Sequence, residues 1–351
     1  MVQTMLNPLD FGAAGDGETD DTQALQKTLD RAAQIGGAIN IPTGTYLCSE
    51  LKIASGVVIS GQPGWSYRNP GGSILKLAHA EARCLLDITG ALGVTINGLS
   101  LEGEQLGSNI HGILMDKDDY GDQEDAPTIE RCRISHFTGD GIHLGRVWVF
   151  SVRHCMLSHN TGCGLRVRGW DGFVMDNWLS GNKDAGYGAY DENASVTMTG
   201  NRIEWNGAGG IVLRGGSHYN ITGNYIDRSF KVGIDLQSRD GTPCRQITAT
   251  GNLIYRSGRT AQEGSHSSAH VRMTGAEGVT FTGNTLTVGQ DDGGKGRWSP
   301  EFGIVIEELS NCVIANNTLH RAALKELILD RGEHGSGLVV TDNPGSTFSP
   351  S

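Results

Sequence analysis

A frame of residues that recurs along the chain constrains its fold more than any other feature. Residues 200–213 read GNRIEWNGAGGIVL and residues 223–236 read GNYIDRSFKVGIDL. Further copies place Asn177, Asn252, Asn284 and Asn317 at the same position, with Cys132 and Cys155 in the first two copies. The spacings from residue 132 onward are 23, 22, 24, 23, 28, 32 and 33 residues. A constant frame with growing spacing indicates one repeated coil of chain, with insertions at its turns.

Each copy contains short runs with alternating hydrophobic residues, such as ITGNYI and GIDL. Strands of three to five residues cannot each bury a core alone, but coils stacked about 4.8 Å apart can. The repeats therefore predict an all-β solenoid of parallel strands, a β-helix.

The recurring asparagines have a structural explanation. At a dry turn, an inward asparagine can satisfy backbone groups and bond to the next asparagine of the stack. We therefore interpret this column as architecture rather than chemistry. The seven cysteines contain no CxxC pair, which argues against a zinc site or a disulfide framework and favours reduced, buried thiols.

The first 60 residues differ from the repeats. Residues 24–33 have helical spacing, with Asp20, Asp21 and Thr22 as N-cap candidates, and a short amphipathic helix would cover the open end of a solenoid. The segment FGAAGDGETDDTQALQKTLDRA, followed by GGAINIPTGTY, resembles the opening of the pectate-lyase-like superfamily of right-handed parallel β-helix proteins. We expect a single domain, with the cap and first coil over about 1–60, stacked coils over about 61–345 and a tail at 346–351.

This resemblance implies a partner and a set of functions. The superfamily includes polysaccharide hydrolases, lyases, epimerases, fructan-cleaving transferases and phage tailspikes. A poly- or oligosaccharide is therefore the expected ligand, and trimers are frequent among such proteins, so a homotrimer is an open alternative. Because fold does not define function, the site has to be argued from its own residues.

Composition narrows the partners further. The formal net charge is −11, which argues against a nucleic-acid partner because the chain offers little cationic charge to replace counterions. The sequence contains no run of 18 apolar residues, so we expect no membrane span. Its first residues do not have the pattern of a signal peptide. An extracellular, virion or cytoplasmic location all remain open.

One outward column predicts a pair of carboxylates. Glu204 and Asp227 occupy equivalent positions in adjacent coils, where their backbones lie about 4.8 Å apart. Paired carboxylates that share a proton can cleave a glycosidic bond, with Trp205 offering a face for a sugar ring. We predict a glycoside hydrolase with Glu204 and Asp227 as catalytic residues and Asp235 as a third candidate. The alternative is that both are solvated or paired with Arg202 and Arg228.

A second column concentrates basic residues. His143, Arg166, Arg168 and Arg214 are predicted to point outward, where they could bind carboxylates or sulfates of a sugar chain. The alternative is ion pairing with Asp171, Asp191 or Asp235. Trp298, on a long insertion, is a further candidate for closing over a sugar.

The segment DAGYGAYDEN, residues 184–193, invites comparison with alginate epimerases and lyases, whose active strand carries Tyr-Gly, then Asp, then His. Here Tyr187-Gly188 matches, but Tyr190 and Glu192 replace the acid and the histidine. Elimination or epimerisation through Tyr190, Glu192 and the arginines is therefore an alternative to hydrolysis. A non-catalytic glycan-binding or tailspike protein is another.

No cofactor is expected, with one alternative. The acidic loop DKDDYGDQED could bind calcium. Its carboxylates are Asp116, Asp118, Asp119, Asp122, Glu124 and Asp125. The competing interpretation is a solvated loop.

Overall fold

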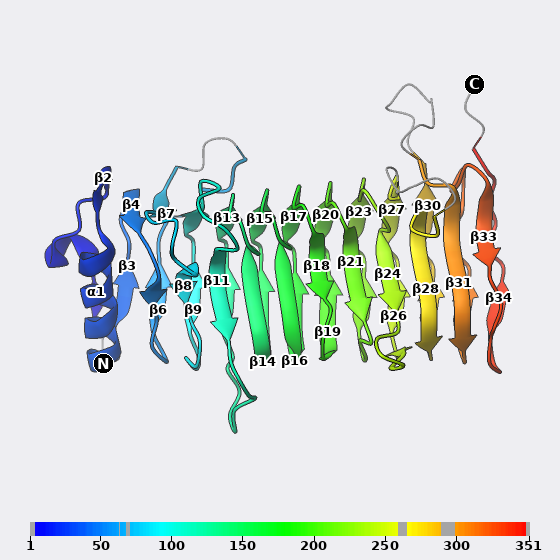
Figure 1. Ribbon diagram of the computed structural model, residues 1–351, viewed down its shortest axis with the longest axis horizontal. Coiled ribbons are helices and arrows are strands. Elements are labelled where there is room, and N and C mark those ends of the chain that lie inside the picture. Colours follow the sequence, from blue (N-terminus) through cyan, green and yellow to red (C-terminus); the bar gives the residue numbers. More distant parts are fainter. Residues whose placement is uncertain (1–3, 63, 68–70, 259–264, 289–298, 349–351) are drawn as a thin grey trace. The chain divides into compact units, whose positions relative to one another are not determined.

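The computed structural model describes residues 4–62, 64–67, 71–258, 265–288 and 299–348. The chain divides into two compact units, residues 1–173 and 174–351. Each unit is a stack of short parallel strands, as Figure 1 shows, and the fold is the parallel β-helix predicted from the repeats. Within the described residues, no helix combines the length and apolar character that a membrane span needs.

In the first unit, the strands form two parallel stacks, illustrated by β10 between β7 and β13 and by β11 between β8 and β14. The elements are β1 (Met5–Leu6), η1 (Pro8–Phe11), β2 (Asp16–Asp20), α1 (Thr22–Ile35), β3 (Ala38–Asn40), β4 (Gly44–Cys48), β5 (Leu51–Lys52), β6 (Val58–Ser60), β7 (Ser73–Leu77), β8 (Cys84–Asp87), β9 (Thr95–Asn97), β10 (Ser100–Glu102), β11 (His111–Asp116), β12 (Thr128–Glu130), β13 (Arg133–Ser135), β14 (Ile142–Arg153), β15 (Met156–Ser158) and β16 (Leu165–Met175), whose last residues lie past the division.

The second unit repeats the same plan. Its elements are β17 (Trp178–Ser180), β18 (Ala185–Ala189), β19 (Asn193–Thr199), β20 (Arg202–Glu204), β21 (Gly209–Arg214), β22 (Asn220–Thr222), β23 (Tyr225–Asp227), β24 (Ile234–Gln237), β25 (Cys244–Arg245), β26 (Thr248–Thr250), β27 (Leu253–Tyr255), β28 (Ala269–Glu277), β29 (Thr280–Thr282), β30 (Thr285–Thr287), β31 (Phe302–Ser310), β32 (Val313–Ala315), β33 (Glu326–Asp330) and β34 (Val339–Thr341). One coil runs through β21, β22 and β23, and each of these strands pairs in parallel with its counterpart one coil away.

The helix α1 lies against the N-terminal strands of the first unit. Its buried side chains, which include Leu25 and Leu29, pack toward β3, β4 and β5, as the predicted cap requires. The predicted N-cap role of Asp21 is only partly right. Asp21 stands at the N-cap, but its carboxylate accepts the backbone N–H groups of Ala14 and Gly15 at 2.6 and 3.0 Å, so it fixes the preceding loop instead.

The asparagine column forms a continuous ladder in the second unit. Nδ2 of Asn201 donates to Oδ1 of Asn224 at 2.9 Å, and Nδ2 of Asn224 donates to Oδ1 of Asn252 at 3.0 Å. The same bond links the remaining members, Asn177, Asn284, Asn317 and Asn343. Each ladder oxygen also accepts the backbone N–H of the preceding asparagine. The predicted architectural role is therefore confirmed.

Aliphatic side chains fill the space inside the coils. In the second unit, Ile203, Ile226 and Ile254 align in one inward column and are fully buried. All seven cysteines are free and buried, as predicted. The packed interior leaves the outer faces of the strands, and the turns that follow them, as the places where a site can form.

Candidate active sites

The second unit contains a polar cleft on the outer face of β21, β24 and β28. Its volume is about 380 Å3, and its lining residues are Asp184, Tyr190, Ala208, Val212, Arg214, Lys231, Asp235, Ser267 and Arg272. The strand register explains this gathering, because Val212, Asp235 and Arg272 align across the three neighbouring strands. Three cationic side chains thus face two carboxylates in a cleft of a chain that is acidic overall.

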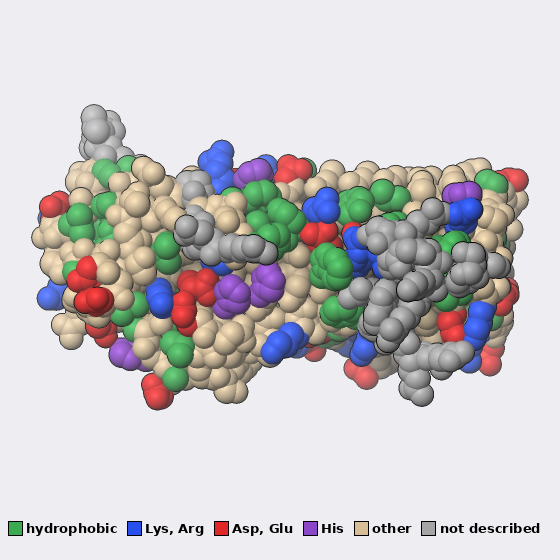
Figure 2. Space-filling model, turned by 90° about the horizontal axis from the view of Figure 1, so that it is seen from above, with side chains coloured by type: hydrophobic (Ala, Val, Ile, Leu, Met, Phe, Trp, Pro, Cys, Tyr) green, Lys and Arg blue, Asp and Glu red, His purple; other side chains and the backbone are tan. Residues whose placement is uncertain are grey.

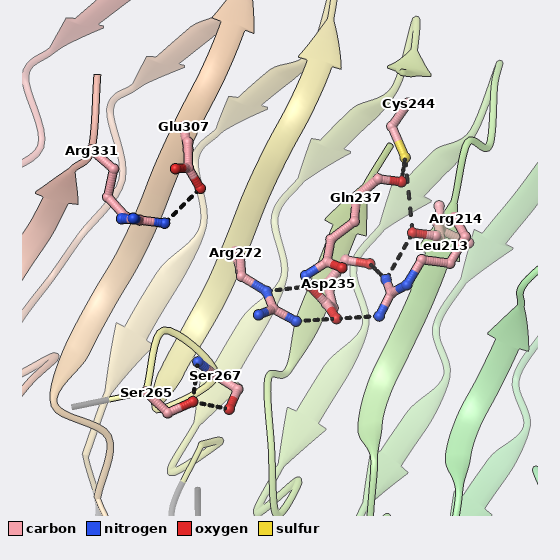
Figure 3. Close-up of polar contacts among 10 residues, drawn as sticks. All are labelled: Leu213, Arg214, Asp235, Gln237, Cys244, Ser265, Ser267, Arg272, Glu307 and Arg331. Carbon is pink, nitrogen blue, oxygen red and sulfur yellow. Dashed lines mark hydrogen bonds and ion pairs between the residues drawn. The ribbon is translucent and has the colours of Figure 1, made fainter. Parts of the chain in front are cut away.

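Asp235 lies at the centre of an ion cluster (Figure 3). Nε and Nη2 of Arg272 each lie 2.8 Å from one of its carboxylate oxygens, and Nη2 of Arg214 lies 2.8 Å from Oδ2. Asp235 is buried, and its two arginine partners are partly exposed. The predicted ion-pair alternative for Arg214 and Asp235 is therefore present. Asp235 orients two guanidinium groups toward the cleft, an arrangement that leaves little room for it as a free general acid.

Tyr190 places a phenol in the same cleft. Its hydroxyl donates to Oδ1 of Asp184 at 2.9 Å. Glu192, in the turn after β18, is exposed and does not line the cleft. Tyr187, whose Tyr-Gly pair matched the alginate enzymes, faces the interior and bonds to the hydroxyl of Tyr219 at 3.1 Å. The accessible phenol is therefore Tyr190.

Glu204 and Asp227 align across β20 and β23, as predicted. Their exposure differs from the expectation, because Glu204 is 5% exposed and Asp227 is 0% exposed. Nε1 of Trp178 donates to Oε1 of Glu204 at 2.7 Å, and Nε of Arg202 lies 2.9 Å from Oε2. Arg228 pairs with Oδ2 of Asp227. Neighbouring side chains of the same face therefore cover both carboxylates, so the predicted ion-pair alternative is present here as well.

Asp227 has the chemistry of an acid that is neutral at mildly acidic pH. Burial raises its pKa to about 6, the charge of Glu204 adds to the rise, and Arg228 opposes it. Among the described residues, Oδ1 of Asp227 has no hydrogen-bond partner. Trp205 is 39% exposed, with the Arg228 guanidinium 5.0 Å from its ring centre, so one face of the ring is occupied.

One face of the molecule mixes side-chain types. On the face seen in Figure 2, acidic and basic side chains stand among hydrophobic ones in the part that the grey residues leave visible. In the second unit, Arg202 lies over the rings of Trp178 and Tyr225, at 5.6 and 4.7 Å from their centres. Rings and guanidinium groups at such spacing present flat surfaces and donors that suit a sugar chain.

The remaining predicted residues lie elsewhere. His143, Arg166 and Arg168 belong to β14 and β16 of the first unit, where each is partly exposed and His143 pairs with Asp140 at 2.8 Å. Trp298 lies outside the described residues. In the acidic loop, Lys117 binds both carboxylate oxygens of Asp125 at 2.7 and 2.8 Å. Calcium binding by the rest of that loop stays a prediction.

Sequence reasoning missed several residues of the clefts. Asp184, Lys231 and Arg272 line the cleft but are not among the site residues predicted from the sequence. Asp184 and Lys231 lie in the turns before β18 and β24. The one sequence signal that could have identified them as cleft residues is that they precede equivalent strands of the repeated coil. The first unit has a separate cleft of about 480 Å3 that was also missed. Its polar lining includes Lys76, Glu102, Glu104, Arg133 and His136.

Comparison with known proteins places the chain in a family. Residues 93–254 and 140–294 match the family described as right handed beta helix region, and residues 5–71 match rhamnogalacturonase A/epimerase, pectate lyase-like. The chain is a right-handed parallel β-helix. It belongs to the right-handed β-helix family, and the resemblance seen in its first 60 residues is confirmed.

Individual relatives share part of the chain. It is 27% identical over 265 residues to mannuronan C5-epimerase AlgE3 from Azotobacter vinelandii, covering 66% of this chain and 14% of that protein. It is 27% identical over 238 residues to AlgE5 of the same organism, covering 60% and 23%. The chain thus spans less than a quarter of these relatives.

Solved structures show the same fold. The A-module of Azotobacter vinelandii mannuronan C-5 epimerase AlgE6 superposes with a TM-score of 0.69 at 19% identity, covering 95% of this chain and 88% of that one. The Dettilon tailspike protein superposes with a TM-score of 0.65 at 17% identity, covering 96% and 64%. At these identities the likeness is one of fold.

Proposed function

We propose that this chain acts on an acidic polysaccharide and that the cleft of the second unit transfers a proton to or from a uronate residue. One observation carries the proposal: a phenol bonded to a carboxylate, Tyr190 to Asp184, lies in a cleft lined by Arg214, Lys231 and Arg272. Lys231 is exposed and has no ion-pair partner among the described residues. Its ammonium group is available to a carboxylate of the substrate.

The chemistry follows from what a uronate needs. The proton at C5 lies next to a carboxylate, and removing it places negative charge on that group. Cations around the carboxylate stabilise this charge. The oxygen of the phenol can take the C5 proton as its own proton passes to the neighbouring carboxylate, and the reverse transfer returns a proton to the sugar. Return of a proton to the opposite face epimerises the sugar. Breaking the neighbouring C–O bond instead leaves a double bond in the uronate and releases the other sugar, whose oxygen takes a proton.

The relatives support the same substrate class, because their names assign them to mannuronan, an acidic polysaccharide. The chain departs from the Tyr-Gly, Asp, His motif of the alginate enzymes, which indicates that its site differs from theirs. Tyr187 is buried, and Tyr190 occupies the position where the alginate enzymes carry an acid. The proposal therefore assigns the phenol role to Tyr190 and does not depend on the motif.

Product analysis tests the proposal. The purified chain is incubated in D2O with polymannuronate, with polygalacturonate and with a neutral β-glucan. Deuterium at C5 or an ultraviolet-absorbing unsaturated product from either uronate is the expected result. New reducing ends without ultraviolet absorbance would indicate hydrolysis instead. Binding to a uronate without any product would contradict catalysis and support a non-catalytic glycan-binding protein.

Hydrolysis by Glu204 and Asp227 is the second candidate function. It is favoured by their alignment in adjacent strands and by the raised pKa of Asp227, which together resemble an acid beside a second carboxylate. It requires the Arg228 side chain to move from Asp227 when a sugar binds. Replacing both carboxylates by amides would abolish hydrolysis and leave proton exchange at C5 intact.

A further inference from the structure

We propose that Asp140 and His143 form a second proton-transfer site, in the first unit, directed at a uronate whose carboxylate binds Arg166. The site is separate from the cleft of the second unit, and its substrate class rests on the proposed function. His143 would be the base that contacts the substrate. Asp140 would position its ring.

Hydrogen bonds fix the ring of His143. Its Nδ1 lies 2.8 Å from Oδ2 of Asp140, and the other carboxylate oxygen accepts the backbone N–H of Cys163 at 2.7 Å. Asp140 is buried, and several hydrogen bonds and the nearby imidazoles hold its pKa below its ordinary value despite the burial. A carboxylate in this position keeps the proton of neutral His143 on Nδ1. Nε2 is then left as the proton acceptor, the arrangement used when an aspartate orients a histidine base.

His111 completes the cluster without competing for the proton. Its Nδ1 accepts the backbone N–H of Asp140 at 3.0 Å, and its ring centre lies 4.7 Å from that of His143. Burial lowers the pKa of His111 to about 4, so its ring is neutral near pH 7. His111, Asp140 and His143 are also close enough to hold a metal ion. Nδ1 of both histidines and both carboxylate oxygens of Asp140 are, however, already engaged in the hydrogen bonds above.

Two glycines make room for the cluster. A Cβ atom at Gly139 would lie 2.8 Å from Nδ1 of His111, and one at Gly162 would collide with Oδ1 of Asp140. The segments TGDGIH and TGCG, residues 138–143 and 161–164, therefore allow the backbone to approach these polar groups closely. Neither position is in the left-handed region, so proximity is what excludes a larger residue.

The strand register places Arg166 beside His143. In the preceding strand pair, the bond from Ile113 N–H to Gly141 O accompanies the alignment of Leu114 with His143. The equivalent bond between β14 and β16 runs from Ile142 N–H to Gly164 O at 3.0 Å. It therefore aligns His143 with Arg166, with backbones about 4.8 Å apart. The charge of Arg166 also contributes to lowering the pKa of His111, which agrees with this placement.

The step balances without a cofactor. Nε2 of His143 takes the proton from the carbon next to the uronate carboxylate, and the C–H electron pair moves into that carboxylate. Arg166 offsets the new negative charge, and the imidazolium keeps its Nδ1–H bond to Asp140. The proton then returns to the carbon, or leaves on the sugar oxygen released when the neighbouring C–O bond breaks.

Two measurements test the inference. In long-range 1H–15N correlation spectra of the full chain, neutral His143 should carry its proton on Nδ1, and Asp140→Asn should shift it toward Nε2. With polymannuronate as substrate, the kcat that remains in Tyr190→Phe should fall by about a further 100-fold when His143→Gln is added, with KM changed less than about threefold. His79→Gln, at a half-exposed histidine of the same unit, is the matched control and should leave the rate of Tyr190→Phe unchanged when it is added to that variant.

Three outcomes would overturn the inference. Equal turnover by Tyr190→Phe and by Tyr190→Phe with His143→Gln would remove this site and leave the proposed function standing. No turnover of any uronate by the wild type would remove both. Retained zinc in the dialysed wild type, absent from His143→Gln and Asp140→Asn, would make the cluster a metal site instead.

Discussion

Arg272 binds both carboxylate oxygens of Asp235, with Nε and Nη2 each 2.8 Å from one oxygen. The two residues stand on adjacent strands, 37 positions apart in the sequence. Because Asp235 is buried, loss of Arg272 would leave a buried carboxylate less well compensated, and both side chains line the cleft.

We expect Arg272→Ala to lower the free energy of unfolding by about 1–3 kcal/mol, since Asp235 would keep only Arg214 as a charged partner. Urea denaturation measures the change. Arg245→Ala is the control, because the Arg245–Glu277 pair is about half exposed and its loss should cost less than about 1 kcal/mol. Equal effects of the two substitutions would contradict the structural role of Asp235.

Removing one rung of the asparagine ladder should be costly. Asn224→Ala leaves the backbone N–H and the amide of Asn201 without their acceptor and frees the carbonyl of Met198. We expect a loss of about 2–4 kcal/mol in the free energy of unfolding. Asn220→Ala, an exposed position in the adjoining strand, should change stability by less than about 0.5 kcal/mol. A small effect at both sites would argue against the ladder.

The raised pKa of Asp227 predicts a pH-dependent stability. Its folded-state pKa of about 6 exceeds the ordinary value of 3.8, so its contribution is complete below pH 3.8 and is lost as the pH rises through about 6. Over that range, the free energy of unfolding of the wild type should fall by about 1–3 kcal/mol relative to Asp227→Asn. Thermal or urea unfolding at several pH values measures this. Asp240→Asn, at a side chain 94% exposed, should give a curve parallel to the wild type.

Substitution of the cleft phenol should separate catalysis from folding. Tyr190→Phe removes the hydroxyl that donates to Asp184, and we expect kcat on a uronate polymer to fall about 100-fold or more with stability nearly unchanged. Tyr187→Phe is the converse control. It removes a buried hydrogen bond to Tyr219 and should lower stability by about 1 kcal/mol while keeping kcat. The reverse pattern would place the active phenol at Tyr187.

The fold could be predicted from the sequence because the spacing of the repeats gives the number of residues in each coil. The same register placed Glu204 beside Asp227, and this alignment is confirmed. Exposure could not be predicted in the same way. Long side chains such as Arg202 and Arg228 lie along the outer face and cover the carboxylates, and their direction depends on packing rather than on register.

The polar clusters were harder to predict for a second reason. Asp140 contacts His111, and the acidic loop lies between them in the sequence. The repeat pattern cannot be recognised in that stretch, so the contact could not be predicted from it. Asp184 and Lys231 sit in turns, where no alternation marks a side chain as pointing outward.

The asparagine ladder has a consequence for how such a chain can vary. The asparagine hydrogen bonds join neighbouring coils at one turn only. The number of residues in the rest of each coil can therefore change. The intervals between successive asparagines accordingly vary between 23 and 33 residues, while the amide contacts stay within 2.8–3.1 Å. Insertions at the other turns can therefore add residues beside the clefts and change the specificity of the surface. The hydrogen bonds of the asparagine ladder stay intact when this happens.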